Sequence, residues 1–145
     1  MPRFLKQTIF GDKKGNCFAA CVASLLGRSL DEVPNFCTKY PAVEWWDKFR
    51  DWLHEQGYEA IFLEFKENNW DGAWKMMFTE ADGLMWIASG KSPRGDFLHS
   101  TVYKGAKLFF DPHPDNGGID SDPKDCVLLI PYDPILQLCK KTMYC

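Results

Sequence analysis

Three residues that lie far apart in the chain have the chemistry of a thiol nucleophile system. Cys17 follows Gly15 and Asn16 at the start of an apolar segment, His99 is the second residue of the segment LHSTVY, and Asp111 follows LFF. A thiol attacks a carbonyl carbon, an imidazole takes and returns the proton, and a carboxylate orients the imidazole. We therefore predict a catalytic triad of Cys17, His99 and Asp111.

The segment GNCFAACVASLLG, residues 15–27, predicts the helix that presents the thiol. The apolar residues after Cys17 recur at helical spacing, and Gly27 is a natural C-terminal stop. At the first position of a helix, the helix dipole and the free N–H groups favour a thiolate. The alternative is that Cys17 is a buried structural thiol, as free cysteines often are. We expect the structural role for Cys21, which lies one turn into the helix.

Residues 97–104 and 107–111 predict a β-hairpin that presents the other two members of the triad. The two strands are joined across Lys104-Gly105-Ala106. Counted from a turn centred on Gly105, His99 and Asp111 are equally distant, so we expect them to lie opposite or nearly opposite each other.

The other patterns complete a single α+β domain over residues 1–145, with helices first and an antiparallel sheet second. Ser29 and Glu32 have capping-box spacing. A helix from Pro41 to Gly57 is expected to have an apolar face that includes Val43, Trp46, Phe49, Trp52 and Leu53. Further expected elements are an extended arm over 4–10, strands over 58–65, 84–88 and 126–132, a helix within 68–77 capped by Asn69 or Asp71, and a short helix or tail from Pro134.

The order of these motifs resembles that of papain-like cysteine peptidases, especially small bacterial and phage domains of the double-glycine-peptidase type. GNCFAACVASLLG, LHSTVY and LFFDP stand in that family's Cys, His, Asp order. The resemblance implies that Cys17 is the nucleophile on a helix packed against an antiparallel sheet, that His99 is the base, and that Asp111 orients it. It also implies two oxyanion donors, the backbone N–H of Cys17 and the side chain of Gln7. Gln7 lies farther from Cys17 than the corresponding glutamine of such enzymes, so the segment GDKKG must loop out.

The same resemblance implies a cysteine-dependent hydrolase that cleaves an amide or acyl bond of a peptide or protein through a Cys17 thioester. Such chemistry needs no cofactor and no metal. One alternative is an inactive or non-hydrolytic papain-fold protein that binds or inhibits a partner, for example a phage counter-defence factor. A second alternative is a cysteine-dependent acyl or amine transferase, because one scaffold hosts several reactions.

Composition excludes several other classes of protein. The net charge is −3 and the basic residues are scattered, which argues against a nucleic-acid partner. No run of about eighteen apolar residues is present, which argues against a membrane span. The chain starts MPRFLKQTIF, without an apolar signal segment, so we expect a reducing, cytoplasmic setting for its six cysteines. They contain no CxxC pair that would indicate structural zinc. Substrate identity and oligomeric state stay open.

The remaining histidines and the tryptophans have less specific interpretations. His54 falls on the polar side of its helix, where we expect it to be solvated. In Asp111-Pro-His113-Pro-Asp115 the alternation of acids and histidine permits a metal site or a rival base, although two prolines favour a plain turn. The six tryptophans are expected in the core rather than on a stacking platform. We expect loops 90–96 and 113–123 to border the cleft.

Overall fold

The protein has an α+β fold with a five-stranded antiparallel sheet, and the structure, a computed structural model, describes residues 2–11, 14–65 and 72–132. The sheet order is β1-β5-β2-β3-β4. The expected combination of helices and antiparallel sheet is therefore confirmed. In chain order the elements are α1 (Cys17–Leu26), η1 (Leu30–Glu32), α2 (Phe36–Lys39), α3 (Trp45–Glu55), β1 (Tyr58–Glu64), α4 (Ala73–Glu80), β2 (Met85–Lys91), β3 (Leu98–Lys104), β4 (Lys107–Phe110) and β5 (Asp125–Pro131).

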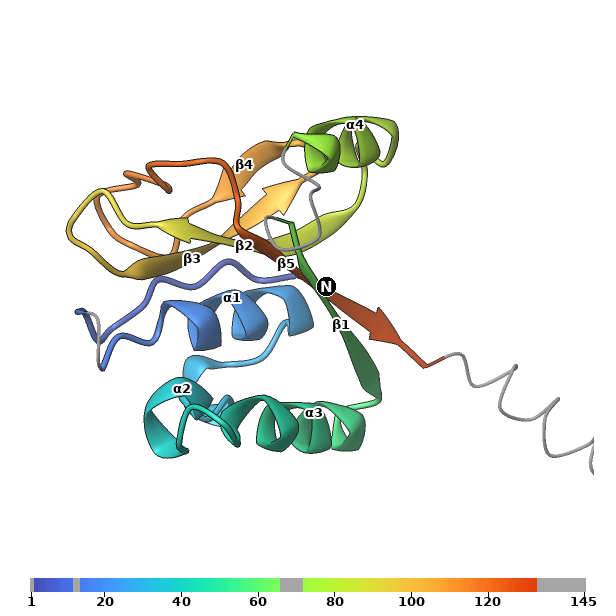
Figure 1. Cartoon of the computed structure of the whole chain (residues 1–145). Coiled ribbons are helices and arrows are strands. Elements are labelled where there is room, and N and C mark those ends of the chain that lie inside the picture. The colour runs from blue at the N-terminus through green and yellow to red at the C-terminus, as the bar shows by residue number, and fades with distance from the viewer. Residues whose placement is uncertain (1, 12–13, 66–71, 133–145) are drawn as a thin grey trace, which may run out of the picture.

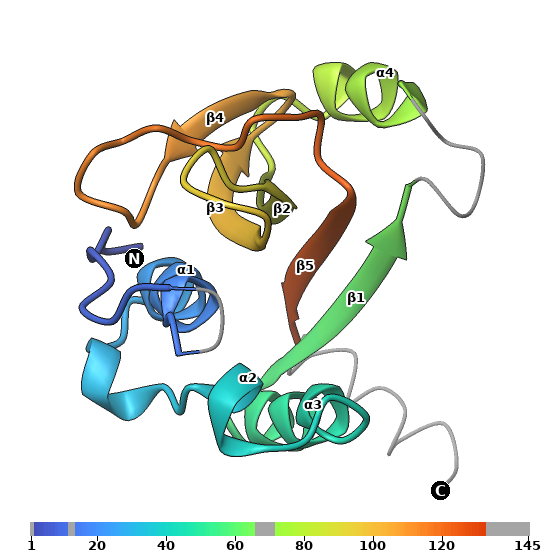
Figure 2. The same cartoon turned by 60° about the vertical axis from the view of Figure 1, so that its left-hand side comes forward.

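The sheet carries helices on both faces, with α1, α2 and α3 on one side and α4 on the other (Figures 1 and 2). Neighbouring residues of the central strand β2 show this division, because Ile87 packs with α1 and α3 whereas Trp86 packs with α4. Both side chains are fully buried. Strand residues alternate between the two faces, so β2 serves two hydrophobic cores at once.

Helix α1 forms as predicted. Residues 18–24 are buried, and Gly27 ends the helix in the left-handed conformation with a φ of 66°. The N–H of Arg28 then returns to the carbonyl of Ala23 at 2.9 Å, which satisfies a terminal carbonyl as in common C-terminal caps. In the next turn, the Glu32 carboxylate accepts hydrogen bonds from the N–H and the hydroxyl of Ser29, so that capping prediction is confirmed.

The second amphipathic helix differs in detail from the prediction. Helix α3 starts at Trp45, not at Pro41, and Val43 precedes it with 86% of its surface exposed. The expected place of Val43 on the apolar face was therefore wrong. The short helix α2 was not predicted. The expected exposure of His54 to solvent holds in part, because 38% of its side-chain surface is exposed, while its Nε2 lies 3.0 Å from a carboxylate oxygen of Glu59 on β1.

The later elements are shifted relative to their predicted bounds. Helix α4 begins after Gly72 and extends to Glu80, beyond the expected end at residue 77. Strand β2 also runs three residues past the predicted 84–88. The proposed caps Asn69 and Asp71, and the helix or tail from Pro134, lie outside the described residues.

The hairpin β3–β4 forms, but its register differs from the prediction. Lys104 pairs with Lys107 and Tyr103 with Leu108, whereas Val102 pairs with Phe110. Phe109 is thus an extra residue in β4, as in a β-bulge. Asp111 lies beyond the end of β4 and is not a ladder partner of His99, so the counting argument was wrong even though the two side chains meet.

The described helices include none that is both long and apolar enough to cross a membrane.

Candidate active site

His99 and Asp111 form a buried pair at one end of the sheet. His99 Nε2 lies 2.7 Å from Asp111 Oδ1, and the two residues are 2% and 3% exposed. β3 supplies the histidine, and the bulged strand β4 leads into the residue that supplies the carboxylate. A buried carboxylate against an imidazole fixes the orientation of the ring and stabilises its protonated form.

The Asp111 carboxylate is held by more than the histidine. Oδ1 accepts the N–H of His113 at 2.8 Å, and Oδ2 accepts the N–H of Gly118 at 2.7 Å. Burial opposes ionisation, but the hydrogen bonds from His99 and from these two N–H groups outweigh it and lower the pKa of Asp111. The acid therefore stays ionised and in place.

Cys17 lies at the first position of α1 and faces the histidine. Burial raises the pKa of its thiol, but hydrogen bonds from His99 and from the backbone N–H of Ser100, together with the charge of His99, reverse this effect. The net pKa lies below the ordinary value for cysteine. The position at a helix N-terminus acts in the same direction.

The pKa of His99 is shifted in the opposite direction, upward. Burial lowers its pKa, but the hydrogen bonds to Asp111 and Cys17 and the charges of both raise it to about 9. A cysteine with a lowered pKa beside a histidine with a raised pKa favours the thiolate and imidazolium forms near neutral pH. The three predicted triad residues are thus brought together in an arrangement able to activate a thiol.

The other cysteines near the helix differ from Cys17. Cys21 is fully buried, and burial raises its pKa well above the ordinary value, with a further contribution from the charge of Cys17. A buried thiol of this kind is unreactive, as expected for its structural role. Cys37 is exposed and lines one of the cavities at Cys17.

Gln7 reaches the same site along an extended N-terminal segment. Its side chain is 6% exposed and lines a cavity together with Cys17 and His99. Its Nε2 donates one hydrogen bond to the carbonyl of Ile9 at 2.9 Å, and a primary amide has a second N–H. The structure thus brings Gln7 to the candidate site, with one of its two donors already used.

Asn16 fixes this N-terminal segment and was not singled out from the sequence. Its Oδ1 accepts the N–H groups of Thr8 and Ile9 at 3.1 and 3.0 Å, and its Nδ2 donates to the hydroxyl of Thr8. The N–H of Gln7 also donates to the carbonyl of Pro112. Asn16 therefore ties the arm to the start of α1, beside Cys17.

Two cavities meet at Cys17. The first, of about 290 Å³, is lined by Gln7, His99, Arg94 and His113. The second, of about 420 Å³, is lined by Trp45, Phe62 and Asp125 among others. Both also contact Gly11, Gly15 and Leu98. Two cavities that both contact the thiol provide space for parts of a substrate near a reacting bond. Arg94 and His113 confirm that parts of the two expected loops border the cleft.

His113 lies beside the candidate triad and does not take the place of His99 in it. Its ring lies 6.2 Å from that of His99, and its Nδ1 lies 3.0 Å from Asp115. Asp115 also binds Arg94, and Asp111 binds His99. Asp111 and Asp115, the two acids that alternate with His113, are thus paired with His99 and Arg94 respectively. Within the described ranges, no group of three or more histidine, cysteine or acidic residues is placed to hold a metal ion.

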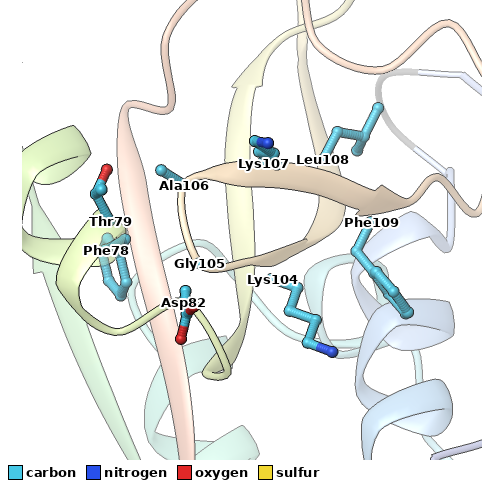
Figure 3. Close-up of a pocket in the computed structure, with 9 residues that line it drawn as sticks. All are labelled: Phe78, Thr79, Asp82, Lys104, Gly105, Ala106, Lys107, Leu108 and Phe109. Carbon is cyan, nitrogen blue, oxygen red and sulfur yellow. The ribbon is translucent and has the colours of Figure 1, made fainter.

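A larger cavity, of about 520 Å³, lies away from the thiol, between α4 and the turn of the β3–β4 hairpin (Figure 3). Phe78 and Thr79 of α4 face the turn at Gly105, and Lys104 Nζ lies over the ring of Phe109 at 5.6 Å. No cysteine or histidine is among its described lining residues. Size alone therefore does not identify the reactive site, and the chemistry points to Cys17.

Comparisons of the chain with models of protein families, with curated proteins and with solved structures found no match in any of the three.

Proposed function

We propose that the protein is a papain-like cysteine-dependent hydrolase, which cleaves an amide or related acyl bond of a peptide or protein through a thioester on Cys17. The observation that carries this proposal is the arrangement of the partly exposed Cys17 with the buried His99–Asp111 pair, in which the thiol pKa is lowered and the imidazole pKa is raised to about 9. A helix-terminal thiol packed against an antiparallel sheet that carries the histidine is also consistent with the proposed scaffold.

The first half of the reaction forms the acyl-enzyme. The Cys17 thiolate attacks the carbonyl carbon, and the oxyanion is stabilised by the backbone N–H of Cys17 and the remaining amide N–H of Gln7. The C–N bond then breaks while His99 donates its proton to the leaving amine. This leaves a thioester on Cys17 and a neutral His99, which Asp111 holds in orientation.

The second half returns the enzyme to its starting state. Neutral His99 removes a proton from water, and the resulting hydroxide attacks the thioester carbonyl. The C–S bond breaks, the acid product leaves, and the thiolate and imidazolium pair is restored. The proton that His99 donates in the first half is replaced from water in the second half, so the cycle needs no cofactor.

A generic acyl donor tests this proposal without knowledge of the natural substrate. With p-nitrophenyl acetate, wild type is expected to release a stoichiometric burst of p-nitrophenol and to carry an acetyl group on Cys17, detected by intact mass and peptide mapping. Turnover then continues as water hydrolyses the thioester. Cys17→Ala should lose both the burst and the adduct, and His99→Ala should lose most of the rate.

Cys37→Ala is the matched control, because Cys37 is an exposed thiol at the same cleft. It should retain the burst. An equal adduct yield in Cys17→Ala, or no adduct in wild type, refutes the proposed function. Adding glycinamide separates hydrolysis from transfer: if acetylglycinamide exceeds acetate at low amine concentration, the enzyme is a transferase instead.

A further inference from the structure

The larger of the two cavities at Cys17 has the features of a selective substrate subsite. We call it the Asp125 pocket. Its volume is about 420 Å³, and it extends from Cys17 across the sheet to Asp125. Trp45 of α3 and Phe62 of β1 form an aromatic wall, while Ser89 and Asp125 contribute polar side chains from the sheet.

A row of polar residues across three strands connects the acid to the nucleophile. Asp125 pairs with Ser89, and Ser89 pairs with Ser100, so the three side chains point to one face of the sheet. The hydroxyls of Ser89 and Ser100 are 3.0 Å apart, and Ser100 also hydrogen-bonds to Cys17. Two strand spacings put the backbones of Asp125 and Ser100 about 10 Å apart.

That separation determines which part of a substrate reaches the acid. A fully extended chain covers about 10 Å in three residues. A substrate whose reacting carbonyl lies at Cys17 therefore places the side chain of a nearby residue, rather than a remote segment, beside Asp125.

Asp125 is the one carboxylate among the described residues that line the pocket, and no described cation forms an ion pair with it. Burial raises the pKa of Asp125, and the negative charge of Glu64 raises it further. The hydrogen bond from Ser89 and the positive charge of Lys124 lower it, and the net pKa is about 6. Above that pH the pocket contains a negative charge that its surroundings compensate only partly. A cation from the substrate would supply the missing compensation.

The aromatic wall favours the same kind of ligand. The Trp45 ring is held in place by edge contacts with Phe18 and Trp46, whose ring centroids lie 5.5 and 5.6 Å away. Aromatic faces attract ammonium and guanidinium groups and also pack against the methylene stems of lysine and arginine. An acid at one end of an aromatic pocket therefore selects a long basic side chain over an apolar or acidic one.

We propose that Asp125 is a specificity-determining residue, which binds the basic side chain of a lysine or arginine close to the substrate bond that Cys17 attacks. This inference rests on the proposed function, whose substrate class it narrows to peptides or proteins with a basic residue next to the cleaved bond.

Matched affinity labels test the inference. The probes are tripeptide chloromethyl ketones with lysine, norleucine or glutamate at the first or the second residue from the reactive carbon, and the measured quantity is the second-order rate of Cys17 alkylation at pH 7.5. At one of the two positions, the lysine probe should react at least about 10-fold faster than the norleucine probe, as expected for a charged hydrogen-bonded contact. Equal rates for lysine and norleucine at both positions overturn the inference.

Variants of the acid identify the source of the preference. Asp125→Asn should bring the lysine-to-norleucine ratio close to one, while Asp125→Glu should largely retain it. Iodoacetamide, which is too small to need the pocket, should alkylate Cys17 at the same rate in wild type and in both variants, which checks that the thiol and the fold are intact. A ratio that is unchanged in Asp125→Asn overturns the role of Asp125.

An equilibrium measurement separates this inference from the proposed reaction. Calorimetric binding of acetyl-Gly-Lys-Gly-amide and of its norleucine analogue is compared in Cys17→Ala and in Cys17→Ala with Asp125→Asn. If Asp125-dependent lysine preference occurs while wild type forms no acetyl-enzyme, the proposed function fails and the subsite stands. If acyl turnover occurs but neither labelling nor binding prefers lysine, the function stands and the subsite fails.

Discussion

Replacing Asp111 with asparagine is expected to weaken activation of the Cys17 thiol without removing the thiol or the imidazole. The carboxylate contacts His99 at 2.7 Å and is almost fully buried. It favours the imidazolium, and the imidazolium in turn favours the Cys17 thiolate. Asn keeps the shape of the side chain but lacks the charge, so both effects should decrease together.

The size of the effect follows from the pKa of His99. The rise from 6.5 to about 9 corresponds to about 3 kcal/mol in favour of the imidazolium, and Asp111 and Cys17 share this contribution. A hydrogen bond to a charged group contributes about 1.5–3 kcal/mol, so the loss of Asp111 should lower the pKa of His99 by about 1–2 units. We expect kcat/KM at neutral pH to fall by about 10- to 100-fold.

The rate of alkylation by iodoacetamide as a function of pH measures this coupling directly, because the thiolate is the reactive form. In wild type the rate should rise at a pH below the ordinary thiol pKa of 9.0. In Asp111→Asn the rise should move upward by about one pH unit. Asp120→Asn is the matched control, since Asp120 is exposed on the same loop. Profiles that coincide for wild type and folded Asp111→Asn would refute the reasoning.

Three further predictions concern stability and can be checked by urea unfolding. Asn16→Ala removes three hydrogen bonds between the N-terminal arm and α1, and should lower the free energy of unfolding by about 1–3 kcal/mol; an unchanged midpoint would contradict this role. Asp125 has a raised pKa of about 6 in the folded state. The ionised carboxylate therefore destabilises the folded protein above pH 6, and this destabilisation decreases as the pH falls toward 4. Asp125→Asn should therefore stabilise the protein by about 1–2 kcal/mol at pH 7.5, once solvent screening is allowed for, and by much less at pH 4. A larger gain in stability at pH 4 than at pH 7.5 would contradict this prediction. Gly105 has a φ of 57°, and an added Cβ would lie 2.8 Å from a backbone carbon of the turn after α4, so Gly105→Ala should cost about 1–2 kcal/mol or more. Gly83→Ala, which meets open space, should cost clearly less.

Local patterns in the sequence determined the elements that position the three candidate site residues. The apolar spacing and Gly27 were sufficient for α1, because helix periodicity and a left-handed C-cap depend on residues within one short segment. The hairpin β3–β4 was equally local, since its strands join through a tight turn. These two elements, together with the order of the motifs in the family that the chain resembles, singled out Cys17, His99 and Asp111 from the cysteines, histidines and acids of the chain.

Tertiary structure decided how those side chains meet and what surrounds them. The extra residue Phe109 altered the hairpin register, and no count from the turn reveals a bulge. The bonds of Asn16 to the arm join segments whose pairing no periodicity indicates. The Asp125 pocket depends on β5, the last described strand, which lies between β1 and β2. Only that non-local insertion aligns Asp125 with Ser89, because pairing between distant strands is determined by the whole core rather than by either strand alone.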